Sequence, residues 1–206
     1  MKKYLVKVKN ILIRRKKKSS RNEEEQRRVK ALRQLKESDL QRWSKDQVFY
    51  DDWNERSHIL GSYVADGSRV IEFGAGKGVL ENYFNKTITY QPVDIVQRTP
   101  NFLVCDLNKI PLSISLAAYN TAIFSGVLEY VYDIEVLFEQ FSTQIPHMIL
   151  SYSCSDICKQ NRLTNGWLSD YTLADLKTIF KKYNYKINRE QHWKDQTLFE
   201  LVQNMT

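Results

Sequence analysis

The sequence predicts an α/β fold with a mostly parallel sheet that ends in an antiparallel hairpin. Strand-like apolar runs alternate with helix-like segments between residues 69 and 152, and this alternation is typical of parallel strands linked by helices. The first run leads directly into a glycine-rich turn, as happens where a buried strand turns sharply into a helix. Two strand-like runs, 185–193 and 197–203, close the chain around a short turn, which predicts a terminal hairpin.

Residues 1–45 are expected to form a helical basic arm, followed by a folded domain over residues 46–206. Residues 1–21 contain ten Lys or Arg residues and no acidic residue, whereas the rest of the chain has 21 basic and 24 acidic residues, a net charge of −3. Apolar residues recur at helical spacing within residues 1–18, which is typical of an amphipathic helix on anionic lipid or on a partner. A solvated, unfolded tail explains this stretch equally well. A second, polar helix over residues 23–45 is expected to pack loosely on the domain or to act as a spacer.

Composition limits the classes of function. The domain has no excess of positive charge, so nucleic acid is a partner only as an alternative that depends on the arm. The three cysteines have no accompanying histidine cluster, which indicates reduced thiols in a cytoplasmic protein and predicts no metal site. No run approaches the roughly 20 apolar residues of a membrane span. Any membrane association is therefore expected to be peripheral, at the inner face, through residues 1–18.

The glycine-rich turn is expected to cradle a nucleotide-type cofactor. It follows the strand-like run 69–73 and precedes a helix-like segment, 79–84. Glycine permits positive φ and lets a ligand approach the backbone, and a helix N-terminus offers unpaired N–H groups. The third residue after Gly76 is valine, so the G-x-G-x-x-G pattern of dinucleotide sites is absent. The carboxylate of Glu72 would repel a pyrophosphate but would suit a cofactor that carries an ammonium and a sulfonium. The residues of this cradle are Glu72, Gly74, Ala75, Gly76 and Gly78.

Acidic residues also follow the next two strand-like runs. The run 87–93 ends at Asp94, sixteen residues after Gly78, and Asp106 lies near the end of the run 102–107. A carboxylate at the tip of the second strand is placed to accept hydrogen bonds from both ribose hydroxyls of a nucleoside. A turn or a helix cap is the structural alternative for Asp94.

Glu72, Asp94 and Asp106 at the ends of three successive strands resemble the motifs of class I S-adenosylmethionine-dependent methyltransferases, over about residues 48–203. The resemblance implies a Rossmann-like seven-stranded fold and S-adenosylmethionine as the cofactor. It also implies that Asp106 receives the adenine amino group while the N–H of Leu107 reaches a ring nitrogen. The cofactor-binding set is then Glu72, Gly74, Ala75, Gly76, Gly78, Asp94, Ile95, Asp106, Leu107, Ser125 and Gly126.

The segment 119–131 resembles the fourth-strand motif of the same family. Asn120 replaces the usual aspartate, and Tyr130 replaces a frequent histidine, which removes one candidate base. The resemblance implies that Ser125 and Gly126 lie beside the methionine half of the cofactor. The acids and tyrosines near these strand ends are the candidate catalytic residues: Glu129, Tyr130, Asp133 and Tyr152.

The remaining elements complete the expected domain. A helix over residues 52–63 is expected to pack on the sheet near the pocket, and another over 134–144 precedes the fifth strand, 148–152. The irregular stretch 153–170 is long for a loop in a compact domain, which predicts a lid at the substrate entrance. A last helix, 173–183, begins with a Thr-x-x-Asp capping box.

The resemblance implies methyl transfer to a hydroxyl or an amine of a small molecule or glycan, and a lipid-linked acceptor would fit an arm held at a membrane. Two alternatives remain from this reading. One is an RNA methyltransferase steered by the basic arm. The other is a non-catalytic partner subunit that keeps the cofactor site.

Overall fold

The computed structural model describes residues 19–20, 22–45 and 53–203. The amphipathic helix expected over residues 1–18 lies outside these ranges, so it stays a prediction. Within the described ranges, no helix is long and apolar enough to cross a membrane.

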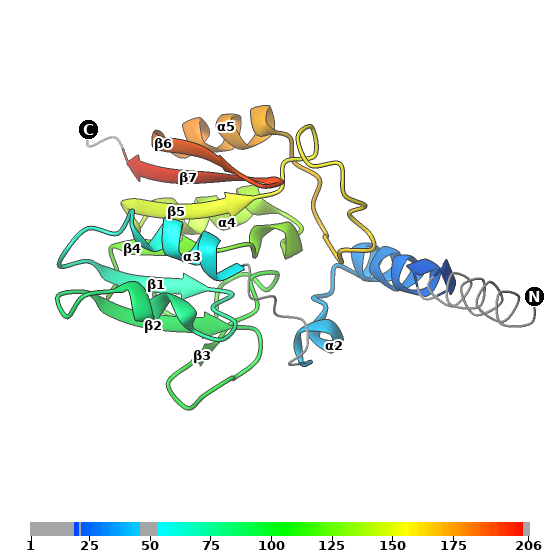
Figure 1. Cartoon of the computed structure of the whole chain (residues 1–206), viewed down its shortest axis with the longest axis horizontal. Coiled ribbons are helices and arrows are strands. Elements are labelled where there is room, and N and C mark those ends of the chain that lie inside the picture. The colour runs from blue at the N-terminus through cyan, green and yellow to red at the C-terminus, as the bar shows by residue number, and fades with distance from the viewer. Residues whose placement is uncertain (1–18, 21, 46–52, 204–206) are drawn as a thin grey trace, which may run out of the picture.

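A single seven-stranded sheet forms the centre of the fold, and the predicted α/β architecture is confirmed (Figure 1). The strand order is β3-β2-β1-β4-β5-β7-β6. The first five strands are parallel, and β7 lies antiparallel between β5 and β6. The predicted terminal hairpin is thus present. The strands are β1 (Arg69–Phe73), β2 (Thr89–Asp94), β3 (Leu103–Val104), β4 (Thr121–Phe124), β5 (His147–Tyr152), β6 (Tyr185–Trp193) and β7 (Gln196–Gln203).

Helices cover both faces of the sheet, which is why the central strands are mostly apolar. On one face, Ile71 and Phe73 of β1 belong to a core that includes Phe138 and Phe180 from two helices. On the other face, Val70 packs in a cluster with helical residues such as Leu60. The first face is covered by α4 (Ile134–Ser142) and α5 (Leu173–Lys182), and the second by α3 (Trp53–Gly61) and the 3₁₀ helix η2 (Val79–Tyr83).

Two elements are shorter than the sequence predicts. The segment after the glycine turn is a 3₁₀ helix of five residues, and the chain is already extended at Phe84. The side chain of Asn85 accepts a hydrogen bond from the N–H of Thr87 at 2.9 Å, and this local turn competes with helix extension. Strand β3 has only two residues, because only Leu103 and Val104 pair with β2. The cofactor cradle therefore rests on a short turn rather than on an α-helix.

The N-terminal segment 22–45 packs against the domain, so of the two expected alternatives the structure shows packing rather than a spacer. A helix over residues 22–35 ends at Lys36, whose φ of 53° lets the N–H of Glu37 bond to the carbonyl of Leu32 at 3.1 Å. Val29 on this helix is completely buried. After the break, α2 (Leu40–Trp43) begins at Asp39, whose side chain accepts the N–H of Arg42. Figure 1 shows this segment beyond the carboxyl ends of the parallel strands.

Candidate active site

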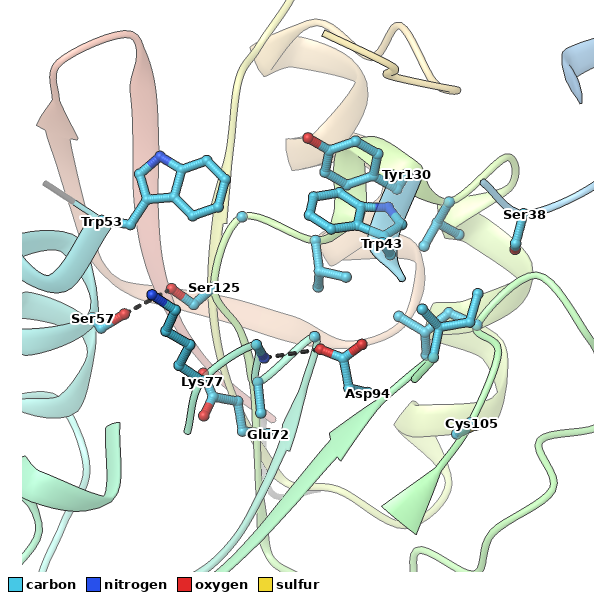
Figure 2. Close-up of a pocket in the computed structure, with 18 of the residues that line it drawn as sticks. Ser38, Trp43, Trp53, Ser57, Glu72, Lys77, Asp94, Cys105, Ser125 and Tyr130 are labelled. Carbon is cyan, nitrogen blue, oxygen red and sulfur yellow. Dashed lines mark hydrogen bonds between the residues drawn. The ribbon is translucent and has the colours of Figure 1, made fainter. Parts of the chain in front are cut away.

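A cavity opens at the carboxyl ends of β1, β2 and β4, where parallel α/β sheets bind ligands. Its walls come from four regions of the chain: the N-terminal segment, α3, the glycine turn, and the loops after β2, β3 and β4 (Figure 2). Most of the expected cofactor residues line it, including Glu72, Gly74, Ala75, Gly76, Asp94, Ile95, Asp106, Leu107, Ser125 and Gly126. The structure thus brings together residues that are up to 54 positions apart in the sequence.

The glycine turn needs glycine for both backbone conformation and space. Gly74 has a φ of 69°, and a Cβ atom there would lie 2.6 Å from a methyl carbon of Val127. Gly78 has a φ of 67° and begins η2, but it does not line the cavity. Its predicted contact with the cofactor stays a prediction, and its positive φ shows a backbone conformation that favours glycine at this position.

Glu72 is a buried carboxyl group that faces the cavity. It is only 3% exposed, and the hydroxyl of Tyr90 donates a hydrogen bond to its Oε2 atom. Burial raises the pKa of Glu72 to about 7, although the Tyr90 hydrogen bond and the nearby charge of Arg56 act in the opposite direction. A cationic group of a ligand beside this carboxylate would favour its ionised form.

Asp94 is the last residue of β2, and its side chain bonds to the backbone of the glycine turn. Its Oδ2 atom accepts the N–H of Gly76 at 2.8 Å, and its Oδ1 atom accepts the N–H of Val96 at 3.2 Å. Burial raises the pKa of Asp94, and these backbone hydrogen bonds limit the rise. Each carboxylate oxygen has a further lone pair available for a ligand hydroxyl. The turn role and the ligand role are compatible in this geometry.

Asp106 lies at the other end of the cavity, beside the N-terminal segment. Its Oδ1 atom accepts the hydroxyl of Ser38 at 2.6 Å and the N–H of Asn108 at 3.0 Å. Leu107, Ser38 and Asn108 also line the cavity. Sequence reasoning did not identify Ser38, because no motif connects it to an acid 68 positions later.

Arg56 is the second functional residue that the sequence reading missed. It is 6% exposed and lines the cavity from α3. Its guanidinium donates to the hydroxyl of Ser125 at 3.1 Å, to the carbonyl of Ser125 at 3.3 Å and to the side chain of Gln196 at 2.9 Å. A Cβ atom at Gly126 would lie 2.5 Å from this guanidinium. The sequence signal that could have identified Arg56 is its position on α3, where it shares the buried side of the helix with Ser57 and Leu60.

Of the four candidate catalytic residues, only Tyr130 lines the cavity. Glu129 is 1% exposed and accepts the N–H of Ser153 at 2.8 Å and the amide of Gln196 at 2.9 Å, so it joins the loop after β5 to the start of β7. Asp133 is exposed and caps α4 by accepting two backbone N–H groups. Tyr152 is completely buried, and its hydroxyl contacts Ser169. These three predictions placed strand-end residues in the site, whereas helix capping and core packing hold their side chains elsewhere.

The loop 153–170 does not line the cavity, contrary to its expected role as a lid. It contacts the N-terminal segment instead. Arg33 donates to the carbonyl of Trp167 at 2.7 Å and pairs with Asp170 at 2.9 Å, and Arg42 donates to the carbonyl of Thr164 at 3.2 Å. The loop therefore supports the segment that borders the cavity.

A family model described as a methyltransferase domain matches residues 42–190. The chain belongs to the methyltransferase domain family. This protein is therefore an S-adenosylmethionine-dependent methyltransferase, which agrees with the resemblance found in its sequence. The matched region begins inside α2, so it takes in Trp43 at the cavity but not Ser38.

Solved structures share the fold of this methyltransferase at low sequence identity. An S-adenosylmethionine-dependent methyltransferase from Mesorhizobium loti has a TM-score of 0.56 and 14% identity, over 70% of this chain and 96% of that chain. The N-terminal domain of EvdMO1, with S-adenosylhomocysteine bound, has a TM-score of 0.51 and 12% identity, over 77% and 83%. The [4+2]-cyclase SpnF has a TM-score of 0.59 and 9% identity, over 74% and 81%. No protein of curated function matches the sequence. Because a cyclase shares the fold, the family match rather than the fold carries the assignment.

Proposed function

We propose that this methyltransferase transfers a methyl group to a hydroxyl or an amine of a small molecule or a glycan. The observation that carries the proposal is the chemistry of the cavity wall. Four carboxylates line it, Asp39, Glu72, Asp94 and Asp106, against two cations, Arg56 and Lys77. A cofactor with one sulfonium and one ammonium suits this balance, whereas a polyanionic acceptor does not.

The residues present fit S-adenosylmethionine along the length of the cavity. Asp106 and the N–H of Leu107 would hold adenine, and Asp94 would accept the ribose hydroxyls. Glu72 would pair with the amino group of the methionine half, and Arg56 with its carboxylate. Glu72 and Arg56 influence each other electrostatically across the cavity, and the opposite charges of an amino acid would match this pair.

Aromatic side chains support a compact acceptor. Trp43 and Trp53 lie on different sides of the cavity in Figure 2, and the ring of Trp43 meets Tyr130 edge to face at a centroid distance of 4.7 Å. Flat apolar faces of this kind bind sugar rings and planar molecules, and they exclude water from the reacting atoms. An acceptor between them would approach the end of the cavity formed by Ser125 and Val127.

Alignment of the acceptor is the main catalytic contribution of the protein in this proposal. The bound cofactor supplies an electrophilic methyl group on sulfur, and the cavity has to hold the acceptor atom in line with it. Burial, and then the charge of Glu129, raises the pKa of Tyr130, so its hydroxyl stays protonated near neutral pH. Tyr130 therefore cannot serve as the base, and its hydroxyl donates to the carbonyl of Asn165 at 3.5 Å.

The experiment is a search for the methylated product with a cofactor labelled in its methyl group. The purified protein is incubated with a small-molecule extract, a glycan and lipid-linked glycan fraction, or total RNA, and each is examined by mass spectrometry. Label is expected in the first or second fraction and reduced with Asp94→Ala when the cofactor concentration is limiting. Label in RNA would contradict the proposal and favour the arm-steered alternative. Cofactor binding without label in any fraction would favour a non-catalytic subunit.

A further inference from the structure

We propose that residues 22–45, here called the cover, form one wall of the nucleoside end of the cofactor site. In this wall Ser38 is a positioning residue that orients Asp106. The inference rests on the role of Asp106 given above under the proposed function. It adds a contribution from a segment that begins twenty residues before the region matched by the family model.

The Ser38 hydroxyl occupies a fixed place in a hydrogen-bond network. It donates to Oδ1 of Asp106 at 2.6 Å and accepts from the side-chain amide of Asn108 at 2.8 Å. Asn108 is held in turn, because its amide donates to the carbonyl of Tyr130 at 2.9 Å and its oxygen accepts the N–H of Tyr132 at 2.9 Å. The cover, the loop after β3 and the loop after β4 therefore meet at Asn108.

This network makes the two oxygens of Asp106 unequal. Oδ1 receives two donors, from Ser38 and from the backbone N–H of Asn108, whereas Oδ2 has no hydrogen-bond partner within the described part of the chain. A carboxylate held in this way offers one oriented acceptor to a ligand amino group. A 6-oxo purine presents an acceptor at the same position and would meet an unpaired carboxylate oxygen. Ser38 therefore contributes to the discrimination between an amino and an oxo group.

Ion pairs hold the cover in the position that this network requires. Asp39 is 3% exposed and lies between Arg28 and Arg42, at 2.6 Å from Nη2 of Arg28 and 3.4 Å from Nε of Arg42. Glu25 contacts both arginines as well, at 2.6 Å from Arg28. Arg28 and Glu25 belong to the helix 22–35, whereas Asp39 and Arg42 follow the break. The cluster therefore fixes the angle of the break, and Ser38 lies inside that break.

Contacts with the domain fix the same segment from outside. The hydroxyl of Tyr132 donates to the carbonyls of Leu32 (2.7 Å) and Glu37, which lie on either side of the helix end. The guanidinium of Arg98 donates to the carbonyl of Trp43. Since Trp43 and Ser38 both line the cavity, a cover held by these contacts is expected to slow the release of a nucleoside bound at Asp106. The cover should thus control how fast the cofactor exchanges.

The test uses S-adenosylhomocysteine and its 6-oxo analogue as ligands of the full-length protein. Calorimetry gives the two affinities, and stopped-flow displacement gives the dissociation rates. Ser38→Ala should weaken S-adenosylhomocysteine about tenfold, the effect of losing one hydrogen bond to a charged group. Most of the loss should appear as faster dissociation, and the preference over the 6-oxo analogue should shrink. Ser38→Thr, which keeps the hydroxyl, should restore the slow dissociation and the preference over the 6-oxo analogue.

Matched controls separate orientation from general damage. Ser44→Ala removes a hydroxyl from the same segment, where it bonds to the carbonyl of Leu40 at 2.8 Å and does not line the cavity as far as the described residues show. It should change the affinity of neither ligand. Tyr132→Phe removes the contacts that hold the cover near Ser38 but keeps the Ser38 hydroxyl, so it should speed dissociation of both ligands and reduce the preference less than Ser38→Ala does. An unchanged preference in Ser38→Ala would overturn the inference. If the wild-type protein does not bind S-adenosylhomocysteine, the proposed function itself fails.

Discussion

The buried carboxyl group of Glu72 predicts a pH dependence of stability that one substitution should remove. In Glu72→Gln the amide oxygen can still accept the Tyr90 hydroxyl, while the titrating proton is lost. The folded protein raises the pKa of Glu72 from its ordinary 4.5 to about 7, chiefly by burial. Each unit corresponds to about 1.4 kcal/mol, so the pH-dependent contribution approaches about 3 kcal/mol.

Whether stability rises or falls with pH depends on how many protons Glu72 binds in the folded and in the unfolded protein. Between pH 4.5 and 7 the folded protein holds a proton on Glu72 that the unfolded chain has already lost. The stabilisation is therefore complete below the unfolded pKa and disappears as the pH rises through the folded value. Relative to Glu72→Gln, the wild-type protein should lose about 3 kcal/mol of unfolding free energy between pH 4.5 and pH 8.

Urea unfolding at a series of pH values, without cofactor, measures this difference. Glu139→Gln provides the control, because Glu139 is an exposed acid on α4, which packs on the other face of the sheet. Addition of S-adenosylhomocysteine should flatten the wild-type profile, since its ammonium would keep Glu72 ionised. Parallel profiles for the wild-type protein and Glu72→Gln would refute the reasoning, because Glu72 would then titrate as an exposed acid does.

Three further predictions concern binding. Asp94→Ala should cost about 1–3 kcal/mol of S-adenosylhomocysteine affinity in calorimetry, because ribose hydroxyls and the Gly76 N–H lose their acceptor; equal affinity would remove Asp94 from that role. Arg56→Lys should cost about 1–2 kcal/mol of affinity in the same assay, because an ammonium cannot bond to Ser125 and to a ligand carboxylate at once as the planar guanidinium can. An unchanged affinity would contradict the proposed contact between Arg56 and the ligand carboxylate. Deleting residues 1–18 should abolish co-sedimentation with anionic vesicles, which the full-length protein should show at low salt and largely lose near ~0.5 M. Full-length protein that ignores such vesicles would contradict the membrane association.

The strands and the acids at their tips could be predicted from the sequence because both follow local rules. A buried parallel strand is a short apolar run, and Glu72 and Asp94 occupy its immediate end, so neighbouring residues determine where they point. The same reasoning failed for Glu129, which follows the end of β4 at Phe124 instead of lying within the strand. Its direction depends on Ser153 and Gln196, two partners far away in the chain. Proximity to a strand end thus places a residue near the site but does not aim its side chain.

The cover could not be predicted because its role depends on contacts that leave no local pattern. Its helix is polar and short of apolar residues, which by itself suggests a spacer. It packs through arginines that reach backbone carbonyls, as Arg33 reaches Trp167, and a carbonyl has no sequence signature. The aromatic and acidic residues at its break gave no periodic signal either. Only the fold brings Ser38 within 2.6 Å of Asp106.

Ser38 and Arg56 were not identified from the sequence, and both connect the cavity to other parts of the molecule. Arg56 binds Gln196, and Gln196 binds Glu129, so the end of the cavity proposed to hold the methionine half is linked to β7 and, through Glu129, to the loop after β5. That loop contacts the cover through Arg33, and the cover carries Ser38 to the nucleoside end. A ligand that pairs with Arg56 therefore acts on the same hydrogen-bonded loop that supports the cover. Both ends of the cofactor site consequently depend on a loop that does not line the cavity.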